Sequence, residues 1–169
     1  MSVDLSVVPE HFRRYVQLIT EEGNILDILA HQTSLDVDFY ASISAEKSTF
    51  RYAENKWTIK EVLQHVIDTE RIFQFRALCI ARNESQALNG FDENAYAKAA
   101  NGNHRSWEDL QAEFHLVRQA SLALFRSFEL TVWKNSGKVG NYEITVEGLI
   151  YSVLGHSLHH EKIIRERYL

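Results

Sequence analysis

The last fifteen residues, "GHSLHHEKIIRERYL" (155–169), contain three of the chain's eight histidines. Imidazole nitrogens bind metal ions and transfer protons near neutral pH. Residues four apart lie on the same face of a helix, with Cβ atoms about 5–6 Å apart. His156 and His160 can therefore close on one ion at about 2.0–2.1 Å from each nitrogen. His159 is adjacent to His160 in sequence, so it cannot point at the same position.

The apolar pattern of this segment predicts which histidines face inward. With Val146 as the origin, His160 falls inside the apolar stripe, about 40° away, and His156 lies on its flank, about 80° away. His159 lies about 140° away, so we expect it to be solvated. Gly155 would allow another helix to approach closely at the same turn. The stripe itself comprises Val146, Leu149, Ile150, Val153 and Ile164.

A third ligand has to come from another segment, and His65 is the best candidate. It lies in "EVLQHVIDTE", where it flanks the apolar stripe of a second amphipathic helix. His31 and His115 fall on more polar faces of their helices, and His104 lies in a loop. The alternative is that His65 is a hydrogen-bonded boundary residue, and that the His156–His160 spacing arises by chance.

Two other reactive side chains have structural interpretations. Glu70 lies close to the apolar centre of its helix, and a buried carboxylate needs a partner. We favour an ion pair with Arg71, Arg76 or Arg118 over a carboxylate that orients an imidazole or acts as a general base. Cys79 lies off the inward face and is predicted to be a packed thiol.

These residues are positioned by four long segments with helical periodicity. The chain has one proline and seven glycines among 169 residues, so few residues interrupt a helix. Thr58 and Glu61 form a capping box, and Asn24 is a plausible N-cap. The pattern predicts one domain, residues 1–169, that is all-α: a four-helix bundle with a long connection between its second and third helices. The helical segments are 24–44, 58–83, 106–128 and 145–164.

The connections add smaller elements. A short helix is expected after Pro9, another within the connection 83–105, and a turn of strand within 131–144. The stretch "LNGFDENAY" in the first long connection is a candidate wall of a cleft, where Phe91, Asp92 and Tyr96 would contact substrate. A packed crossover explains this stretch equally well.

Composition excludes several classes of protein. A net charge of −5 and a pI near 5.9 argue against nucleic-acid binding, which needs a basic surface. No apolar run is long enough to cross a bilayer. The start, "MSVDLSVVPEHFRR", lacks the pattern of a secretory signal, and the single cysteine forms no intrachain disulfide. We therefore expect a cytoplasmic protein.

Three stretches together resemble the DinB-like (DinB/YfiT) superfamily. They are "KWTIKEVLQHVIDTERIFQFRALCIAR", "LNGFDENAY" and "GHSLHHEKIIRERYL", and the likeness extends from about Asn24 to Leu169. The family is a four-helix bundle with a divalent metal held by one histidine of the second helix and an H-x-x-x-H pair of the last. These positions match His65, His156 and His160, the three residues that the phase argument prefers.

The resemblance also implies a class of activity. Members of the family are described as metal-dependent hydrolases, and some resemble S-transferases or isomerases that use low-molecular-weight thiols. Zinc and nickel are both consistent with the likeness, and many members form homodimers. Three imidazoles leave open positions on an ion, as in catalytic zinc sites.

We therefore expect a metal-dependent enzyme that activates a thiol or water for attack on a small electrophile, as an S-transferase or a hydrolase. The sequence assigns no catalytic side chain beyond the ligands. Two alternatives stay open: a non-catalytic bundle that binds a small molecule or metal, and a structural bundle with an adventitious ion.

Overall fold

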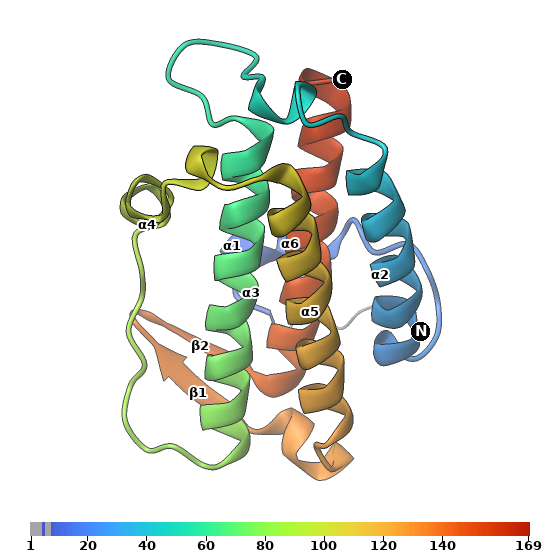
Figure 1. Cartoon of the computed structure of the whole chain (residues 1–169). Coiled ribbons are helices and arrows are strands. Elements are labelled where there is room, and N and C mark those ends of the chain that lie inside the picture. The colour runs from blue at the N-terminus through green and yellow to red at the C-terminus, as the bar shows by residue number, and fades with distance from the viewer. Residues whose placement is uncertain (1–4, 6–7) are drawn as a thin grey trace.

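The structure, a computed structural model, describes residue 5 and residues 8–169. Residues 1–4 and 6–7 lie outside the described part of the chain. The prediction that the N-terminal segment is no secretory signal falls partly on these residues. Six helices and one hairpin follow each other along the chain (Figure 1): α1 (Glu10–Val16), α2 (Ile25–Ala41), α3 (Ile59–Ala81), α4 (Glu93–Ala100), α5 (Trp107–Arg126), β1 (Ser136–Val139), β2 (Tyr142–Thr145) and α6 (Val146–Arg167). The prediction of a helical bundle built on four long helices is confirmed. No helix of the described chain has the length and apolar character needed to span a membrane.

Each long helix begins at a side chain that satisfies its free backbone N–H groups. Thr58 and Glu61 form the predicted capping box at the start of α3, in which each side chain bonds the other residue's backbone N–H. Ser106 accepts a hydrogen bond from the N–H of Asp109 at the start of α5. Because these caps are encoded locally, the helix starts agree with the sequence pattern. The remaining long helices are capped by Asn24 and Thr145.

The long connection between α3 and α5 makes these two consecutive helices run in the same direction. Figure 1 shows that α3 and α5 run downward, whereas α2 and α6 run upward. The helix α3 packs against α5 and α6, and α2 packs against the same two helices on the other side. The chain therefore has to return along the whole length of the bundle between α3 and α5, and α4 lies in this crossover.

A two-stranded hairpin holds the start of the crossover in place. The strands β1 and β2 pair antiparallel, with Val139 opposite Tyr142, across a turn where Gly140 has φ +56°. The backbone of Leu88 bonds the end of β1, donating to the carbonyl of Lys138 at 2.9 Å and accepting from the N–H of Gly140 at 2.8 Å. The start of the crossover is thus fixed beside β1, where Leu88 forms a parallel bridge with Val139.

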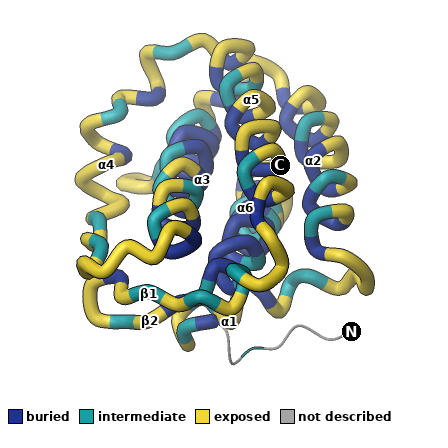
Figure 2. The backbone as a smooth tube through the Cα atoms, turned by 90° about the horizontal axis from the view of Figure 1, so that it is seen from below, coloured by how far each residue is buried: buried dark blue, intermediate teal, exposed yellow. Residues whose placement is uncertain are grey.

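The core consists of two apolar clusters with polar residues between them. Figure 2 shows that the long helices turn their buried residues toward one another and their exposed residues outward. One cluster contains Leu29, Phe73, Phe125 and Leu149, among others. The second contains Tyr40, Leu63, Phe114 and Ile164, among others. Burying polar groups is costly unless they are paired, so the polar residues between these clusters must be paired or bind a ligand.

The short helix α1 packs against α6 at the turn that carries the histidines. A Cβ atom at Gly155 would lie 2.7 Å from the backbone carbon and oxygen of Tyr15. Only glycine allows the two backbones to approach this closely. The expected close approach at Gly155 is confirmed, and it places Tyr15 beside His156 and His159.

Candidate metal centre

The structure brings the three predicted histidines together. His65 extends from α3, and His156 and His160 extend from successive turns of α6. The Nε2 atom of His156 lies 3.1 Å from Nε2 of His65 and 3.1 Å from Nε2 of His160. The nitrogen atoms that could act as ligands all lie within 4.8 Å of one another. Two residues ninety-one positions apart in the chain thus face each other across the α3–α6 interface.

This geometry fits a small divalent ion. Bonds of about 2.0–2.1 Å at tetrahedral angles place neighbouring ligand atoms about 3.3–3.4 Å apart, close to the two 3.1 Å separations. A neutral imidazole has one N–H donor and one lone pair, so the lone pairs of three rings can converge on one centre. Imidazole ligands suit zinc and nickel, the two metals that the family resemblance implies. The donor set therefore fits the expected group.

Burial keeps the three rings neutral. It lowers the pKa of His65 from 6.5 to about 4, with a smaller contribution from the nearby His159. Burial also holds the pKa of His156 and of His160 well below the ordinary value, and the neighbouring rings lower it further. A neutral imidazole has its lone pair free, so at pH 7 all three side chains are in the state that binds metal.

Neighbouring side chains hold the rings in position. The indole of Trp57 packs on His65 with ring centroids 4.9 Å apart. Thr69 lies one turn after His65, with its Oγ1 atom 3.4 Å from Nδ1 of His65. The edge of Tyr15 meets His156 at a centroid distance of 5.9 Å. Such contacts restrict ring rotation and leave Nε2 directed at the common centre.

The histidines open onto a cavity of about 360 Å³. This volume is in the range that holds a small molecule. Its wall is assembled from α1, α3 and the residue Trp57 before it, the start of the crossover with the first residue of α4, β2 and α6. Phe91 lines the cavity, as expected, but Asp92 and Tyr96 do not. Asp92 instead caps α4 by accepting from the N–H groups of Asn94 and Ala95, so of the three residues only Phe91 belongs to the cavity wall.

His159 is not the solvated residue that its helical phase predicts. It is half-buried and lines the cavity, with its ring 4.5 Å from that of Tyr15. The reason is α1, which covers a face of α6 that would otherwise be exposed. The ring nitrogens of His159 lie outside the convergent group of the other three. The prediction was therefore wrong about exposure.

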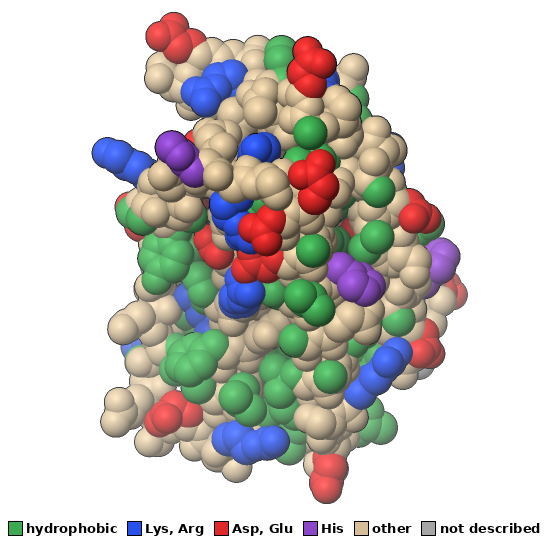
Figure 3. All heavy atoms as spheres, viewed as in Figure 1, with side chains coloured by type: hydrophobic (Ala, Val, Ile, Leu, Met, Phe, Trp, Pro, Cys, Tyr) green, Lys and Arg blue, Asp and Glu red, His purple; other side chains and the backbone are tan. Residues whose placement is uncertain are grey.

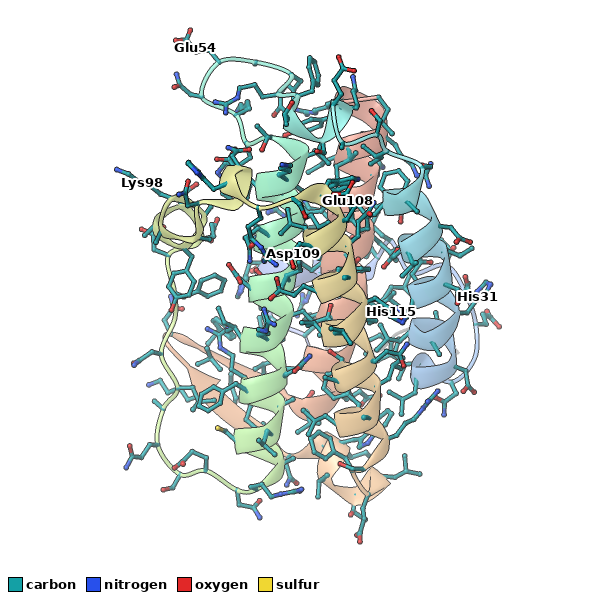
Figure 4. The ribbon with its side chains drawn as sticks, viewed as in Figure 1. His31, Glu54, Lys98, Glu108, Asp109 and His115 are labelled. Carbon is teal, nitrogen blue, oxygen red and sulfur yellow. The ribbon has the colours of Figure 1, made fainter. Side chains whose placement is uncertain are left out.

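The remaining histidines do not join the group. His31 and His115 are exposed on the outer sides of α2 and α5 (Figure 4). His104 is exposed in a turn of 3-10 helix. His11 lies on α1 at the rim of the cavity, where its ring packs on Tyr142 with centroids 4.7 Å apart. Because α1 is short, the position of His11 along it did not indicate that the ring would lie at the rim of the cavity.

Glu70 has the structural role that we favoured. It accepts hydrogen bonds from Nε of Arg118 at 2.9 and 3.1 Å, and Arg118 also contacts Asp36 at 3.3 Å. Ser157 donates to the same Asp36 carboxylate at 2.9 Å, and Ser121 donates to Glu70. We call these five residues the closed polar cluster. Glu70 orients no imidazole, because its partners belong to this cluster.

Cys79 is a packed thiol rather than a nucleophile. It is half-buried on α3 and lies outside the cavity of the histidines. Burial raises the pKa of its thiol, and the nearby Glu84 raises it further. A thiol with a raised pKa carries little thiolate at pH 7.

Comparison with known proteins identifies the family. The model of the DinB superfamily matches residues 37–164. No curated protein matches the sequence. Among solved structures, YfiT from Bacillus subtilis, described as a probable metal-dependent hydrolase with an unusual four-helix bundle topology, superposes with a TM-score of 0.71. The alignment covers 98% of this chain and 90% of YfiT at 18% sequence identity. With a family match that includes α3, the crossover and His156 and His160 of α6, the chain belongs to the DinB superfamily.

Proposed function

We propose that this protein is a metal-dependent enzyme that activates a thiol or water for attack on a small electrophile. In this proposal His65, His156 and His160 hold one divalent ion, zinc or nickel. The observation that carries it is the convergence of three neutral imidazoles at the wall of a cavity of about 360 Å³. A structural zinc site would instead be closed by four protein ligands.

A bound divalent ion would supply Lewis-acid chemistry, lowering the pKa of a thiol or water and polarising a carbonyl. The chain's own residues contribute position and exclusion of water. Phe12 and Phe73 meet edge to face at 5.5 Å and form an apolar part of the cavity wall. Apolar walls reduce the local dielectric, which strengthens charge interactions inside the cavity.

Attack by water would make the protein a hydrolase, and attack by a thiol would make it an S-transferase. The description of YfiT as a probable metal-dependent hydrolase supports water for that protein, and the family resemblance also supports thiols. A direct assay distinguishes them here. Protein stripped with a chelator and reloaded with Zn²⁺ or Ni²⁺ is mixed with a phenyl ester, or with an aryl chloride and a small thiol. Metal-dependent ester cleavage without thiol indicates a hydrolase, whereas thiol-dependent release of chloride indicates an S-transferase.

His160→Ala is the inactive variant for this assay, and His115→Ala is its matched control on an exposed helix face. We expect turnover only in the reloaded wild type and in His115→Ala. Equal rates in the stripped and reloaded wild type, or in His160→Ala, would contradict the proposal.

The alternative of a structural ion makes a different prediction. If the ion held the bundle together, chelation would unfold the protein, as it does small zinc domains. Here two apolar clusters and the closed polar cluster hold the long helices together without it. We expect the far-ultraviolet circular dichroism of the stripped protein to remain helical.

A further inference from the structure

Arg76 lies on the same helix as His65 and lines the same cavity. Eleven residues separate the two, which is close to three full turns, so both project from one face of α3. Only 3% of Arg76 is exposed. It is thus a buried cation in the wall of the cavity that holds the histidines.

Neutral groups fix the guanidinium of Arg76. One terminal nitrogen donates to the backbone carbonyl of Asn89 at 2.9 Å, and the other approaches the hydroxyl of Tyr142 at 3.4 Å. The ring of Phe91 lies 5.7 Å from Cζ. A guanidinium has five N–H donors, so these contacts leave donors available. The side chain is held in place, but its charge is not balanced by these partners.

Several other arginines pair with acidic side chains, in contrast to Arg76. Arg118, which is fully buried, pairs with Glu70 and Asp36. On the face shown in Figure 3, basic and acidic side chains intermix over α3 and α5, where Arg71 and Arg105 both pair with Glu113. Among the residues that the structure describes, no carboxylate lies within 4.0 Å of the Arg76 guanidinium.

An unbalanced buried cation is costly, because burial removes hydration that no carboxylate replaces. Burial lowers the pKa of Arg76 for this reason. A buried charge in a cavity wall that no protein group balances is a candidate for binding a ligand of opposite charge. Arg76 therefore has the properties of a side chain whose partner is a bound anion.

The charge of the cavity agrees with this interpretation. Its described wall contains the buried Arg76, and also one exposed arginine, Arg14, and one exposed carboxylate, Glu93. The whole chain, by contrast, has a net charge of −5. A positive cavity in an acidic protein attracts anions, and low-dielectric walls concentrate that field.

The positions of Arg76 and the histidines limit the length of the ligand. Eleven residues at about 1.5 Å each place the Cα atoms of His65 and Arg76 about 16 Å apart. Long helical side chains lean toward the helix N-terminus, and for Arg76 that direction is toward His65. The lean applies to both side chains, so the Cα separation sets the scale, and a molecule that reaches both groups is on the order of 16 Å long or less.

We propose that Arg76, with the hydroxyl of Tyr142, binds a carboxylate on the small molecule whose other end reacts at the histidines. The substrate class is therefore small, elongated carboxylic acids. Guanidinium N–H groups match carboxylate oxygens in pairs, which favours this anion over a point-like one. This inference rests on the proposed function, because the reacting end is assigned to the histidine site.

The test uses pairs of thiols of equal chain length. In each pair, one member ends in a carboxylate and the other in a hydroxyl: 3-mercaptopropionate with 3-mercaptopropanol, 6-mercaptohexanoate with 6-mercaptohexanol, and 11-mercaptoundecanoate with 11-mercaptoundecanol. Binding to the Co²⁺-loaded full chain is followed through the thiolate-to-cobalt absorption band. We expect the acid to bind at least about tenfold more tightly than its alcohol at one length of the series, as one charged hydrogen-bonded pair provides.

Arg76→Gln is expected to reduce this preference to about one at every length, mainly by weakening the binding of the acids. Arg76→Lys, which keeps the charge but not the planar guanidinium, should retain part of it. Arg82→Gln is the matched control, since Arg82 is exposed at the end of the same helix and lies outside the cavity. Equal loss of acid and alcohol binding in Arg76→Gln would indicate a structural role and overturn the proposal.

A second arm needs no metal. Hexanoate is titrated into the metal-free protein while the Nε–H signal of Arg76 is followed by nuclear magnetic resonance. A saturable shift of this signal, absent with hexanol, supports the anion site even if no cobalt–thiolate band forms; in that case only the thiol alternative of the proposed function fails. No shift with hexanoate, together with equal binding of acids and alcohols by the wild type, would overturn the inference.

Discussion

Two buried polar regions of this bundle differ in how their charges are balanced. The closed polar cluster connects all four long helices, through Asp36 on α2, Glu70 on α3, Arg118 and Ser121 on α5, and Ser157 on α6. Its arginine contacts two carboxylates, and each carboxylate also accepts a hydroxyl hydrogen bond. The region around the cavity, which we call the open site, contains the three convergent histidines and Arg76.

The open site differs in charge balance: three imidazole nitrogens converge there, and no described carboxylate pairs with Arg76. Buried charges are usually paired, so a buried guanidinium without a carboxylate, beside a cavity, is a candidate group for binding an anion. The comparison thus separates polar residues that hold the helices together from polar residues available for binding.

The largest effect should come from removing the arginine of the closed polar cluster. Arg118→Met leaves Glu70 and Asp36 as uncompensated buried charges, and we expect the free energy of unfolding to fall by about 3–5 kcal/mol. Arg76→Met is the matched change at the open site. This change leaves no carboxylate unpaired. It should lower the free energy of unfolding by about 1 kcal/mol, because the hydrogen bond to Asn89 is lost. Urea denaturation measures both, and equal losses would remove the distinction between the two regions.

Low pH should have the next largest effect on the free energy of unfolding, through His65 of the open site. Burial lowers the pKa of His65 to about 4 from 6.5, so between these values the unfolded chain binds more protons than the folded one. Stability of the metal-free protein is therefore full above pH 6.5 and falls as the pH drops toward 4. The expected loss is about 2–3 kcal/mol for His65.

Urea midpoints of the metal-free protein at pH 7, 5.5 and 4.5 measure this loss. His65→Gln should flatten the dependence on pH, whereas His115→Gln, at an exposed position, should leave it unchanged. An unchanged slope in His65→Gln would show that His65 is not the group responsible.

A smaller effect is expected at the contact between α1 and α6. The added Cβ atom of Gly155→Ala meets the Tyr15 backbone at 2.7 Å, so α1 must move away, at a cost of about 1–3 kcal/mol. Because α1 covers the open site and not the closed polar cluster, proteolysis after Arg13 and Arg14 should accelerate while the rest of the bundle stays protected. Gly90→Ala, with open space around its Cβ position, is the control. Uniform destabilisation in the Gly155 variant would contradict this separation.

Features encoded within one helix could be predicted from the sequence. The capping side chains at Thr58 and Ser106 determine where α3 and α5 begin. The inward direction of His156 and His160 follows from the fixed rotation per residue. Arg118 is the partner of Glu70 because α3 packs against α5. The periodicity of a single helix gives no information about this packing, so the sequence left three candidate partners open.

Features that depend on contacts between elements could not be predicted. The half-buried position of His159 requires α1 to fold over α6, and phase on one helix carries no information about that cover. Tyr142 reaches Arg76 because the hairpin and the crossover are bonded to each other at Leu88. The shared direction of α3 and α5 is likewise set by the path of the crossover.

The most direct test of the account is the metal content of protein purified without chelator. Inductively coupled plasma mass spectrometry should find about one divalent ion per chain in the wild type and in His159→Ala. The ion should be nearly absent from His65→Ala, His156→Ala and His160→Ala, each of which removes one of the convergent nitrogens. Metal content in these three variants equal to that of His159→Ala would contradict the assignment of the site.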